Sequence, residues 1–531
     1  MPGIVKGESL IGQWTVPLQG TLRGLPPYAI PQDAVYDSLN VLVRQGAVVP
    51  RSGITNFDLT PLGSRPVGAF STILLASGAF QTDTYQNDTF QLAGNTANNA
   101  LVVATNRKIW AYFSGVWHDL TNAALTASAD NPARLTAIEI ANTINIVIVN
   151  GTDVPQLWDT TTAQVANLVG TPAAPTWSDI TTASDRLIGI IPPYTIQWGN
   201  SLSLATFPAL NFRTLADTID PVVAIRNLGT LGVVVYKTRS IWVGQPGGAT
   251  DASYFAFTLR GFWEGPASSA AVVDADGIHF YMTNIGRLAA FDGTQQQWVC
   301  DGLWPAIKSE IDQAYVGRIF GTFDALNNEV SFYYPRVGDS GQPRGIATIK
   351  LPNVGEGIAQ PVGFRGLQTI PVSCGTDARL LTTRQTFLFG DQSQVGYTLG
   401  GPDDDGTNFS GYFQPGLIAA PAMDLYRLEG FEVFMARGAG RSGTLAVKVV
   451  SNNLLENPDT TNYAVAQPID LSQAPPTQPE GADVTGKFFG LRFEFTTPIS
   501  LKWFTARLAA RRIEPDQPSA FAQMRGYKVA S

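Results

Sequence analysis

Short hydrophobic runs dominate the chain, and many of them end in a small, polar or acidic turn. Seven runs carry an aromatic residue close to such a turn: Arg107–Gly115, Val154–Thr161, Thr195–Asn200, Arg239–Gln245, Arg287–Thr294, Glu329–Pro335 and Thr386–Gln392. We take one aromatic marker from each run, and the markers are Trp110, Trp158, Trp198, Trp242, Phe291, Tyr334 and Phe389. The gaps between markers are 48, 40, 44, 49, 43 and 55 residues. A repeat of this length with several short strands is typical of a β-propeller blade.

Within residues 61–400 the runs alternate as β-strands do and are separated by turn residues. The pattern predicts hairpins at Ala100–Thr121, Ile138–Asp159, Leu231–Gln245, Gly277–Thr294 and Ile319–Pro335. The turns are expected at Asn106, Ser114-Gly115, Asn150-Gly151 and Asn327-Asn328, with Asn-Gly the strongest hairpin signal. Only Leu303–Val316 has helical spacing, with Pro305 in the first turn.

The flanking segments are also expected to be β-rich. Leu22–Tyr36 reads as an extended segment with at most one helical turn after Pro31, and Leu39–Phe57 as a hairpin that turns at Gln45-Gly46. After a linker at Gly400–Gly411, the pattern predicts a long hairpin at Tyr426–Asn453 and two amphipathic strands at 486–498 and 501–515. The Pro/Gln-rich segment Ala466–Val484 is interpreted as a surface loop or a partner-contact loop. This tail is interpreted either as a small β-sandwich or as outer strands that complete the last blade.

The predicted fold class is therefore all-β. We expect an extended arm and hairpin over residues 1–60, an irregular β-propeller-like domain over 61–400, and a β-sandwich-like, β-rich module over 401–531.

The composition bears on the kind of partner. Of 531 residues, 44% are hydrophobic and 15% charged, against about 25% charged in an average soluble domain. So little charge suggests that further surface is covered in an assembly. The net charge is −8 and no Lys/Arg block occurs, which argues against a sequence-reading nucleic-acid binder. An acidic protein can still surround a nucleic acid without gripping it, because it releases no counterions.

Cysteines and apolar segments give little further chemistry. Cys300 and Cys374 lie 74 residues apart and are interpreted as two buried thiols. The first residues have no run of signal-peptide length, and Pro2 stands where myristoylation requires glycine. No stretch of about 20 apolar residues occurs, so no membrane insertion is expected. We expect synthesis in the cytoplasm without Sec export.

Two glycine-containing motifs resemble catalytic or cofactor sites. Gly438–Gly443 spells GxGxxG after a strand, but an alternating strand pattern follows where a dinucleotide site requires a helix. Gly338–Gly341 reads GDSG, and a serine nucleophile would need one of the two histidines, His118 or His279, as its base. Both motifs are interpreted as turns, no P-loop sequence is present, and we predict no enzyme activity and no cofactor.

Acidic turns and solitary tryptophans remain as candidates for binding. Asp403–Asp405 and Asp274–Gly277 resemble calcium loops without the distal glutamate, so a solvated turn is preferred to a weak cation site. With two histidines, zinc or iron binding is not expected, and no metal-binding residue is assigned. The marker aromatics are interpreted as packing between blades. Trp117, Trp177 and Trp263 lie outside the repeated position and would be better platforms for a sugar.

The N-terminal run Gly24–Phe57 resembles the opening of phage tail proteins of the nozzle class, also called tail tubular protein B. Its features are a proline-containing lead, a short segment ending near an Asn, a strand–Gly-turn–strand, and a basic residue beside Pro and Gly, here Pro50-Arg51-Ser52-Gly53. The runs RLIGIIPPYTIQWGNSLS, LGVVVYKTRSIWVGQPGG and DGIHFYMTNIGRLAAFDG are similar to blade segments of that class, so the likeness spans about residues 20–400.

The resemblance implies a structural virion protein without catalytic residues. Proteins of this class form a homohexameric ring that extends the portal and adaptor channel into a short tail, and tail fibres or spikes attach nearby. Their propellers stand on the outside, and the genome passes through the lumen with transient, non-specific contact. The alternatives are a glycan-binding or glycan-cleaving propeller protein and another tail or baseplate component.

Overall fold

The structure is a computed structural model that describes residues 9–15, 18–44, 47–73, 99–353, 355, 358–380, 384–419, 425–436, 444–452, 463–470, 485–496 and 501–512. The chain divides into two compact units. Unit 1 comprises Met1–Arg51, Pro352–Phe364 and Asn408–Ser531, and unit 2 comprises Ser52–Leu351 and Arg365–Thr407. The chain therefore passes between the units four times, and the segments expected at its two ends contribute to the same unit.

Unit 2 contains seven four-stranded antiparallel sheets in the described part of the chain. The first three consist of β6 (Pro66–Ile73), β7 (Asn99–Thr105), β8 (Ile109–Phe113) and β9 (Val116–Asp119); of β10 (Arg134–Ile140), β11 (Thr143–Val149), β12 (Gln156–Trp158) and β13 (Ala166–Asn167); and of β14 (Ile180–Ala183), β15 (Arg186–Ile191), β16 (Thr195–Trp198) and β17 (Phe212–Thr214). The next two consist of β18 (Val222–Asn227), β19 (Val233–Lys237), β20 (Ile241–Pro246) and β21 (Phe255–Gly261); and of β22 (Val272–Ala275), β23 (Ile278–Met282), β24 (Leu288–Phe291) and β25 (Gln296–Trp298).

The last two sheets complete the unit. They consist of β26 (Phe320–Asp324), β27 (Glu329–Pro335), β28 (Pro343–Lys350) and β29 (Val362–Leu367); and of β30 (Val372–Arg379), β31 (Arg384–Gly390), β32 (Gly396–Gly401) and β5 (Gly53–Asp58). In the seventh sheet the outer strand β5 comes from the other end of the unit's sequence and pairs with β32. The C-terminal tail therefore does not complete the last sheet, and this alternative from the sequence is wrong.

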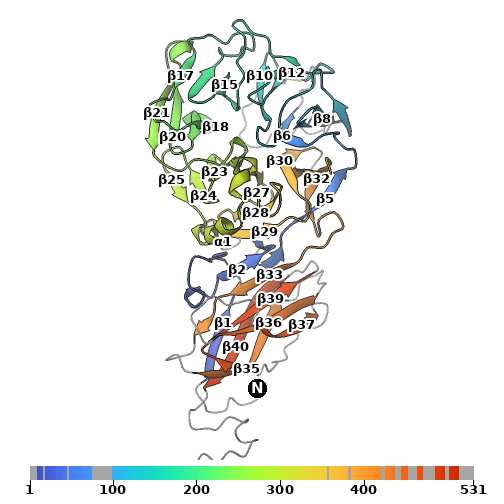
Figure 1. Ribbon diagram of the computed structural model, residues 1–531, viewed down its shortest axis with the longest axis vertical. Coiled ribbons are helices and arrows are strands. Elements are labelled where there is room, and N and C mark those ends of the chain that lie inside the picture. The colour runs from blue at the N-terminus through green and yellow to red at the C-terminus, as the bar shows by residue number, and fades with distance from the viewer. Residues whose placement is uncertain are drawn as a thin grey trace, which may run out of the picture. The chain divides into compact units, whose positions relative to one another are not determined.

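The seven sheets follow one another around a common centre (Figure 1). Their first strands meet in order: β6 contacts β10, β10 contacts β14, β14 contacts β18, β22 contacts β26, and β26 contacts β30. The short 3-10 turn η4 (Ser269–Ala271), which leads into β22, fills the remaining step by contacting β18. β30 in turn contacts β6, so the series of contacts returns to its start.

A separate hydrophobic core lies between each neighbouring pair of these sheets. Strand β19 shows why its sequence is a continuous apolar run: Val233 and Val235 enter the core on one side, and Val234 and Tyr236 enter the core on the other. A strand buried on both faces has no polar side to alternate with. The predicted all-β class is confirmed. The hydrophobic runs of the sequence form the strands whose side chains fill the cores between neighbouring sheets.

Six of the seven marker aromatics are buried in these cores, and Trp110 is half-buried. Five markers lie on the third strand of their sheets, whereas Tyr334 and Phe389 lie on the second strand. The acidic residue that often follows the marker closes the turn. Oδ1 of Asp159 accepts hydrogen bonds from the backbone N–H groups of Thr161 and Thr162, and Oδ1 of Asp292 does the same for Thr294 and Gln295.

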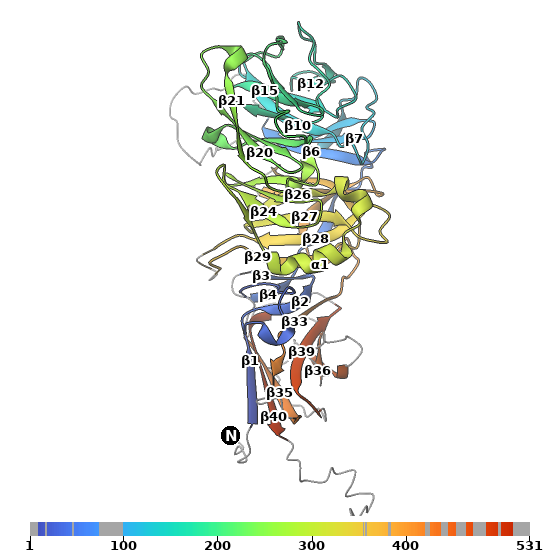
Figure 2. The same ribbon diagram turned by 60° about the vertical axis from the view of Figure 1, so that its left-hand side comes forward.

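Unit 1 contains two six-stranded sheets that share one core (Figure 2). One consists of β1 (Ser9–Trp14), β3 (Val41–Arg44), β4 (Ala47–Pro50), β35 (Tyr426–Ala436), β38 (Thr485–Gly486) and β40 (Leu501–Arg512); the other of β2 (Val35–Leu39), β33 (Gly411–Pro415), β34 (Ile418–Ala419), β36 (Thr444–Asn452), β37 (Tyr463–Asp470) and β39 (Phe488–Phe495). Where their side chains are described, alternate residues of β36 and β39 enter the core, including Val447 and its cross-strand neighbour Phe493.

Several local predictions hold and others are corrected. The hairpin β3–β4 is as expected. The long hairpin predicted at Tyr426–Asn453 does not exist, because β35 pairs with β40 and β38 while β36 pairs with β37 and β39 in the other sheet. The predicted loop at Ala466–Val484 begins as part of β37, and its residues 471–484 lie outside the described residues.

Turns and helices are corrected in the same way. The tight turn of the second sheet is at Ala141-Asn142, both at positive φ, and not at Asn150-Gly151. The side chain of Asn150 accepts hydrogen bonds from the N–H groups of Thr152 and Asp153 and so stabilises a wider loop. The helix α1 (Trp304–Glu310) is shorter than predicted, with Pro305 in its first turn. The helical turn near Pro31 precedes that residue, at η1 (Pro27–Ala29).

Candidate functional site

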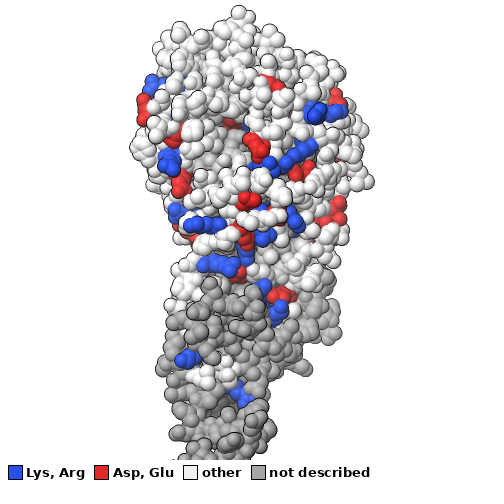
Figure 3. Space-filling view, in the orientation of Figure 1, with Lys and Arg blue, Asp and Glu red and all other residues white. Residues whose placement is uncertain are grey.

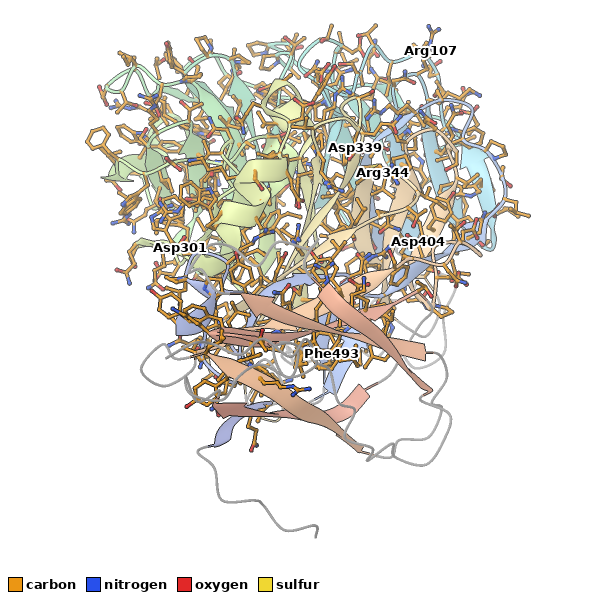
Figure 4. All side chains as sticks on the ribbon, turned by 60° about the horizontal axis from the view of Figure 1, so that its bottom comes forward. Arg107, Asp301, Asp339, Arg344, Asp404 and Phe493 are labelled. Carbon is orange, nitrogen blue, oxygen red and sulfur yellow. The ribbon has the colours of Figure 1, made fainter. Side chains whose placement is uncertain are left out.

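The GDSG sequence forms an exposed turn and not a nucleophile site. Gly338, Ser340 and Gly341 all have positive φ. Oδ1 of Asp339 lies 3.8 Å from Nη1 of Arg344, and both residues are labelled in Figure 4. His279 lies in another sheet and is hydrogen-bonded to Tyr236, at 2.8 Å, and to the carbonyl of Asn227. His118 stacks on Phe113 with ring centroids 4.0 Å apart. No histidine is therefore placed to activate Ser340.

The acidic turns use their carboxylates in backbone hydrogen bonds. Asp404, labelled in Figure 4, is fully buried. It accepts hydrogen bonds from Gln368 Nε2 at 3.1 Å and from the N–H of Thr369 at 2.8 Å. Asp403 accepts from the N–H of Gly406, and Asp274 accepts from that of Gly277. Among the described residues, no group of three Asp, Glu, His or Cys side chains could hold a metal ion. The GxGxxG sequence at Gly438–Gly443 lies outside the described residues.

The three tryptophans proposed as sugar platforms take part in packing between sheets. Trp177 is fully buried and faces Phe207 edge-on, with ring centroids 5.3 Å apart. Trp117 and Trp263 are half-buried; Trp117 packs against the core between the seventh and first sheets, and Trp263 packs against the core between the fourth and fifth sheets. Trp177 is therefore inaccessible to a ligand in this structure.

The two cysteines, Cys300 and Cys374, do not form a disulfide bond. Cys374 is buried and Cys300 is half-buried, so the expectation of two buried thiols holds fully only for Cys374. Burial raises the pKa of each thiol to about 12, which keeps both sulfurs protonated at neutral pH.

Unit 2 contains a cavity that is lined by residues near the N-terminal ends of β6, β10, β26 and β30, which are the first strands of four sheets. Its walls come from the segments 65–69, 129–134, 317–321 and 373–375, with Ala270 from η4. Most of the lining residues are Gly, Ala, Val or Pro, and the exceptions include three arginines, Arg65, Arg134 and Arg318. Arg65 directly precedes β6, Arg134 is the first residue of β10, and Arg318 lies two residues before β26, so each stands at the start of the first strand of its sheet.

Each cavity arginine is paired with an aspartate. Nε of Arg318 donates to Asp130 Oδ1 at 2.7 Å, and its Nη2 donates to Oδ2 at 3.2 Å. Arg65 pairs with Asp391. These two pairs join different sheets, because Asp130 precedes β10 and Asp391 follows β31.

Asp179 is the partner of the third cavity arginine, Arg134, and it also binds a second arginine, Arg226. It is fully buried, and it accepts from Arg134 Nε at 3.2 Å and from Arg226 Nη1 at 2.7 Å. It also accepts from the backbone N–H of Ile225 at 2.9 Å. One carboxylate thereby joins β10, the start of β14 and β18. Since Arg226 also donates to the carbonyl of Ser269, the connection continues to η4.

The cavity arginines stay charged despite their burial. The pKa of Arg134 is lowered to about 10, mainly by burial and secondly by the neighbouring charge of Arg226, while Asp179 opposes both effects. Burial also lowers the pKa of Arg65 and raises that of Asp391, and their ion pair opposes both shifts. The hydrogen bonds from Arg318 lower the pKa of Asp130. The arrangement concentrates positive charge in a partly enclosed space and can hold an anion or fix neighbouring sheets.

Sequence reasoning did not single out these arginines. Their signal is positional: SRPVGAF, PARLTAI and GRIFGTF each place an arginine at the start of a first strand. That signal becomes visible only when the first strand of each repeat is known, because the marker aromatics lie on later strands.

In unit 1, two residues from the N-terminal motif meet directly. Asn40 and Arg51 flank the hairpin β3–β4, and Arg51 Nε donates to Asn40 Oδ1 at 3.0 Å. Both residues are buried, and the guanidinium of Arg51 lies 3.9 Å from the ring centre of Phe409. Asn40 Nδ2 donates to the carbonyl of Ser410 at 2.7 Å. The Asn and the basic residue of the motif thus form one structural contact.

The face of the molecule shown in Figure 3 has no large patch of one charge among the described residues. In Figure 3, Lys/Arg and Asp/Glu side chains of the described residues are interspersed, and no block of a single sign covers unit 2 on that face. Among the described residues, no helix has the length and apolar character needed to cross a membrane.

Comparison with known proteins does not place the chain in a family. No protein-family model and no curated protein matches it. Among solved structures, the computationally designed Ika8 protein matches with 14% identity over 73% of this chain and 100% of its own, at a TM-score of 0.37. A chain of a mitotic checkpoint complex matches with 9% identity over 65% of this chain and 95% of its own, at a TM-score of 0.35. Likenesses this weak show neither a shared fold nor a shared function.

Proposed function

We propose that this chain is a structural protein of a short phage tail, of the nozzle class, and that unit 2 is a seven-bladed β-propeller. In this reading each four-stranded sheet is one blade, and β5 completes the seventh. Unit 1 is a β-sandwich of two six-stranded sheets. The protein acts by assembly into a homohexameric channel below the portal and adaptor, which retains the genome and then conducts it during ejection.

The observation that carries the proposal is the contact between Asn40 and Arg51. The nozzle-class opening that the sequence resembles contains an Asn, a strand–Gly-turn–strand and a basic residue beside Pro and Gly. These elements come together here as one hairpin with its two ends joined by a hydrogen bond. The register of the hairpin places Asn40 opposite Arg51, and the side-chain hydrogen bond between the Asn and the basic residue is the part of the contact that their residue types add.

Burial of the marker aromatics supports a scaffold over a binding protein. A sugar platform needs exposed ring faces, whereas six of the seven markers are buried between sheets. Neither the GDSG turn nor the acidic turns form a reactive constellation. A low charged fraction and a net charge of −8 suit a channel wall along which DNA slides without being held.

Solution mass and negative-stain images of the purified full-length protein test this proposal. We expect ring-shaped hexamers, either alone or on addition of a portal–adaptor complex. A stable monomer that fails to bind that complex and instead binds or cleaves a polysaccharide would show that the chain is a glycan-directed propeller protein. Assembly with a baseplate in place of a portal–adaptor complex would show a different tail component.

A further inference from the structure

Within the described part of the chain, the terminal nitrogens of two cavity arginines make no contact with a hydrogen-bond acceptor. Arg134 bonds to Asp179 through Nε, and Arg65 pairs with Asp391 through Nε. Among the described residues, Nη1 and Nη2 of both side chains have no hydrogen-bond partner. Neither pair of nitrogens is among the buried atoms that lack a partner, so these nitrogens are accessible to solvent. Both side chains are 23% exposed, and both line the same cavity.

The charges around this cavity do not balance. Four arginines interact there with one another or with shared carboxylates: Arg65, Arg134, Arg226 and Arg318. They face three aspartates, Asp130, Asp179 and Asp391. Four positive and three negative charges leave an excess of one positive charge, because Asp179 serves two arginines. Cys374 adds no negative charge, since its thiol is protonated.

Size and rigidity of the cavity restrict the occupant. Its volume is about 40 Å³, which is room for about three water molecules. Gly68, Gly321 and Gly375 form part of the wall on three first strands, so backbone approaches the space closely. A tetrahedral oxyanion fits such a space, whereas a nucleotide does not. Guanidinium groups are the side chains best suited to such an oxyanion, because their N–H groups bind it in pairs.

We infer that unit 2 binds a small oxyanion of the phosphate class in this cavity, held by the Nη groups of Arg65 and Arg134. The bound anion neutralises the excess positive charge and joins the first and second sheets of the unit. Arg318 contributes charge and keeps its pairing with Asp130. This site is independent of the oligomeric state and of the tail function proposed above.

Calorimetric titration of the full-length protein with inorganic phosphate tests the inference, in a buffer without other oxyanions and at constant ionic strength. We expect saturable binding of one phosphate per chain, and a thermal midpoint that keeps rising with the logarithm of the phosphate concentration above the Kd. In Arg134→Gln the affinity should fall at least about tenfold, as expected for losing a charge-assisted hydrogen bond. Asp179 keeps Arg226 and two backbone donors in that variant.

Arg134→Lys serves as the second variant if Arg134→Gln does not fold. It keeps the charge next to Asp179 but lacks the paired terminal N–H groups, so phosphate affinity should still fall. Arg287→Gln is the matched control, because Arg287 is also half-buried and paired, with Asp301 at 3.0 Å, but lies outside the cavity. It should bind phosphate as the unmodified protein does. Absence of saturable binding, or equal affinity in the folded Arg134 variant and the control, would overturn the inference.

Discussion

Arg51 Nε donates a hydrogen bond to Oδ1 of Asn40 over 3.0 Å, and this contact joins the two ends of the hairpin β3–β4. Asn40 has a φ of 57°, in the left-handed region that Asn adopts more readily than most residues. Its amide group also donates to Ser410, which leads into β33. One side chain therefore fixes a backbone reversal, the hairpin and the approach of a strand from the other sheet of unit 1.

Replacing Asn40 should separate backbone strain from hydrogen bonding. Asn40→Ala removes both side-chain bonds and places a Cβ residue without a stabilising amide at positive φ, so we expect unit 1 to lose about 2–4 kcal/mol of unfolding free energy. Asn40→Gly removes the same bonds without the strain and should cost about 1 kcal/mol less. Hydrogen exchange of β3 and β36 measures both losses. Unchanged exchange in both variants would contradict the structural role of the motif.

Removing the Asp179 carboxylate in unit 2 should have a larger effect. Asp179→Ala leaves Arg134 and Arg226 without their carboxylate in a partly buried space, and we expect a loss of about 3–5 kcal/mol. Asp301→Ala is the control, because Asp301 is 51% exposed and its pair with Arg287 should contribute less than about 1 kcal/mol. Hydrogen exchange of β14 and β18 follows the change. If the two variants lose equal stability, Asp179 does not hold the sheets together.

The local pattern of the sequence was sufficient for most hairpins of unit 2. Alternating apolar residues with Asn, Asp or Gly between them specify both a strand pair and its turn, as in β23–β24 and β26–β27. The markers were also interpreted correctly, because a residue that recurs once per repeat and is apolar in every copy serves packing. Tyr334 shows the limit, since it is buried like the others but lies on a different strand of its sheet.

Long-range pairing could not be predicted from the same pattern. β35 and β36 are consecutive and amphipathic, yet they belong to different sheets. The alternation of apolar and polar residues predicts a strand but does not specify which strand it pairs with. The pairing of β5 with β32 joins residues more than 330 positions apart. The cavity arginines were missed for the same reason: each is an ordinary polar residue beside a strand until the sheets bring three of them together.

Stability of unit 2 should fall at mildly acidic pH because of His279. Burial lowers its pKa from 6.5 to about 4 in the folded protein, and its ring is enclosed between Tyr236 and Asn227. As pH falls from about 6.5 to 4, the unfolded chain takes up a proton that the folded chain does not. This contribution to stability is therefore complete above about pH 6.5 and decreases toward pH 4, by about 3 kcal/mol in all.

The measurement is the unfolding free energy between pH 4 and 7, compared with that of His279→Gln. The variant is expected to be less stable at pH 7 and to depend less on pH in this window, because glutamine does not titrate. Carboxylates titrate equally in both proteins, so their effect is removed by taking the difference. Parallel pH curves would show that His279 is not responsible.

Trp177 and Gly189 give the sharpest test of packing between sheets. A Cβ at Gly189 would lie 2.3 Å from Cγ of Trp177, so the indole occupies the space that any side chain at position 189 would need. Gly189→Ala should therefore cost about 1–3 kcal/mol through overpacking. Gly317→Ala is the matched control: its Cβ would meet no atom within 4 Å and its φ is not positive, so the change should stay within about 0.5 kcal/mol.

Trp177→Ala should cost about 3–5 kcal/mol, because it empties a fully buried site. Adding Gly189→Ala to that variant should then cost little or even restore some stability, since the new methyl group enters the vacated space. This coupling is measured by urea unfolding of the two single variants and the double variant. Additive losses would mean that the two residues do not share one site. A sugar platform would behave in the opposite way, with Trp177→Ala leaving stability intact while abolishing glycan binding.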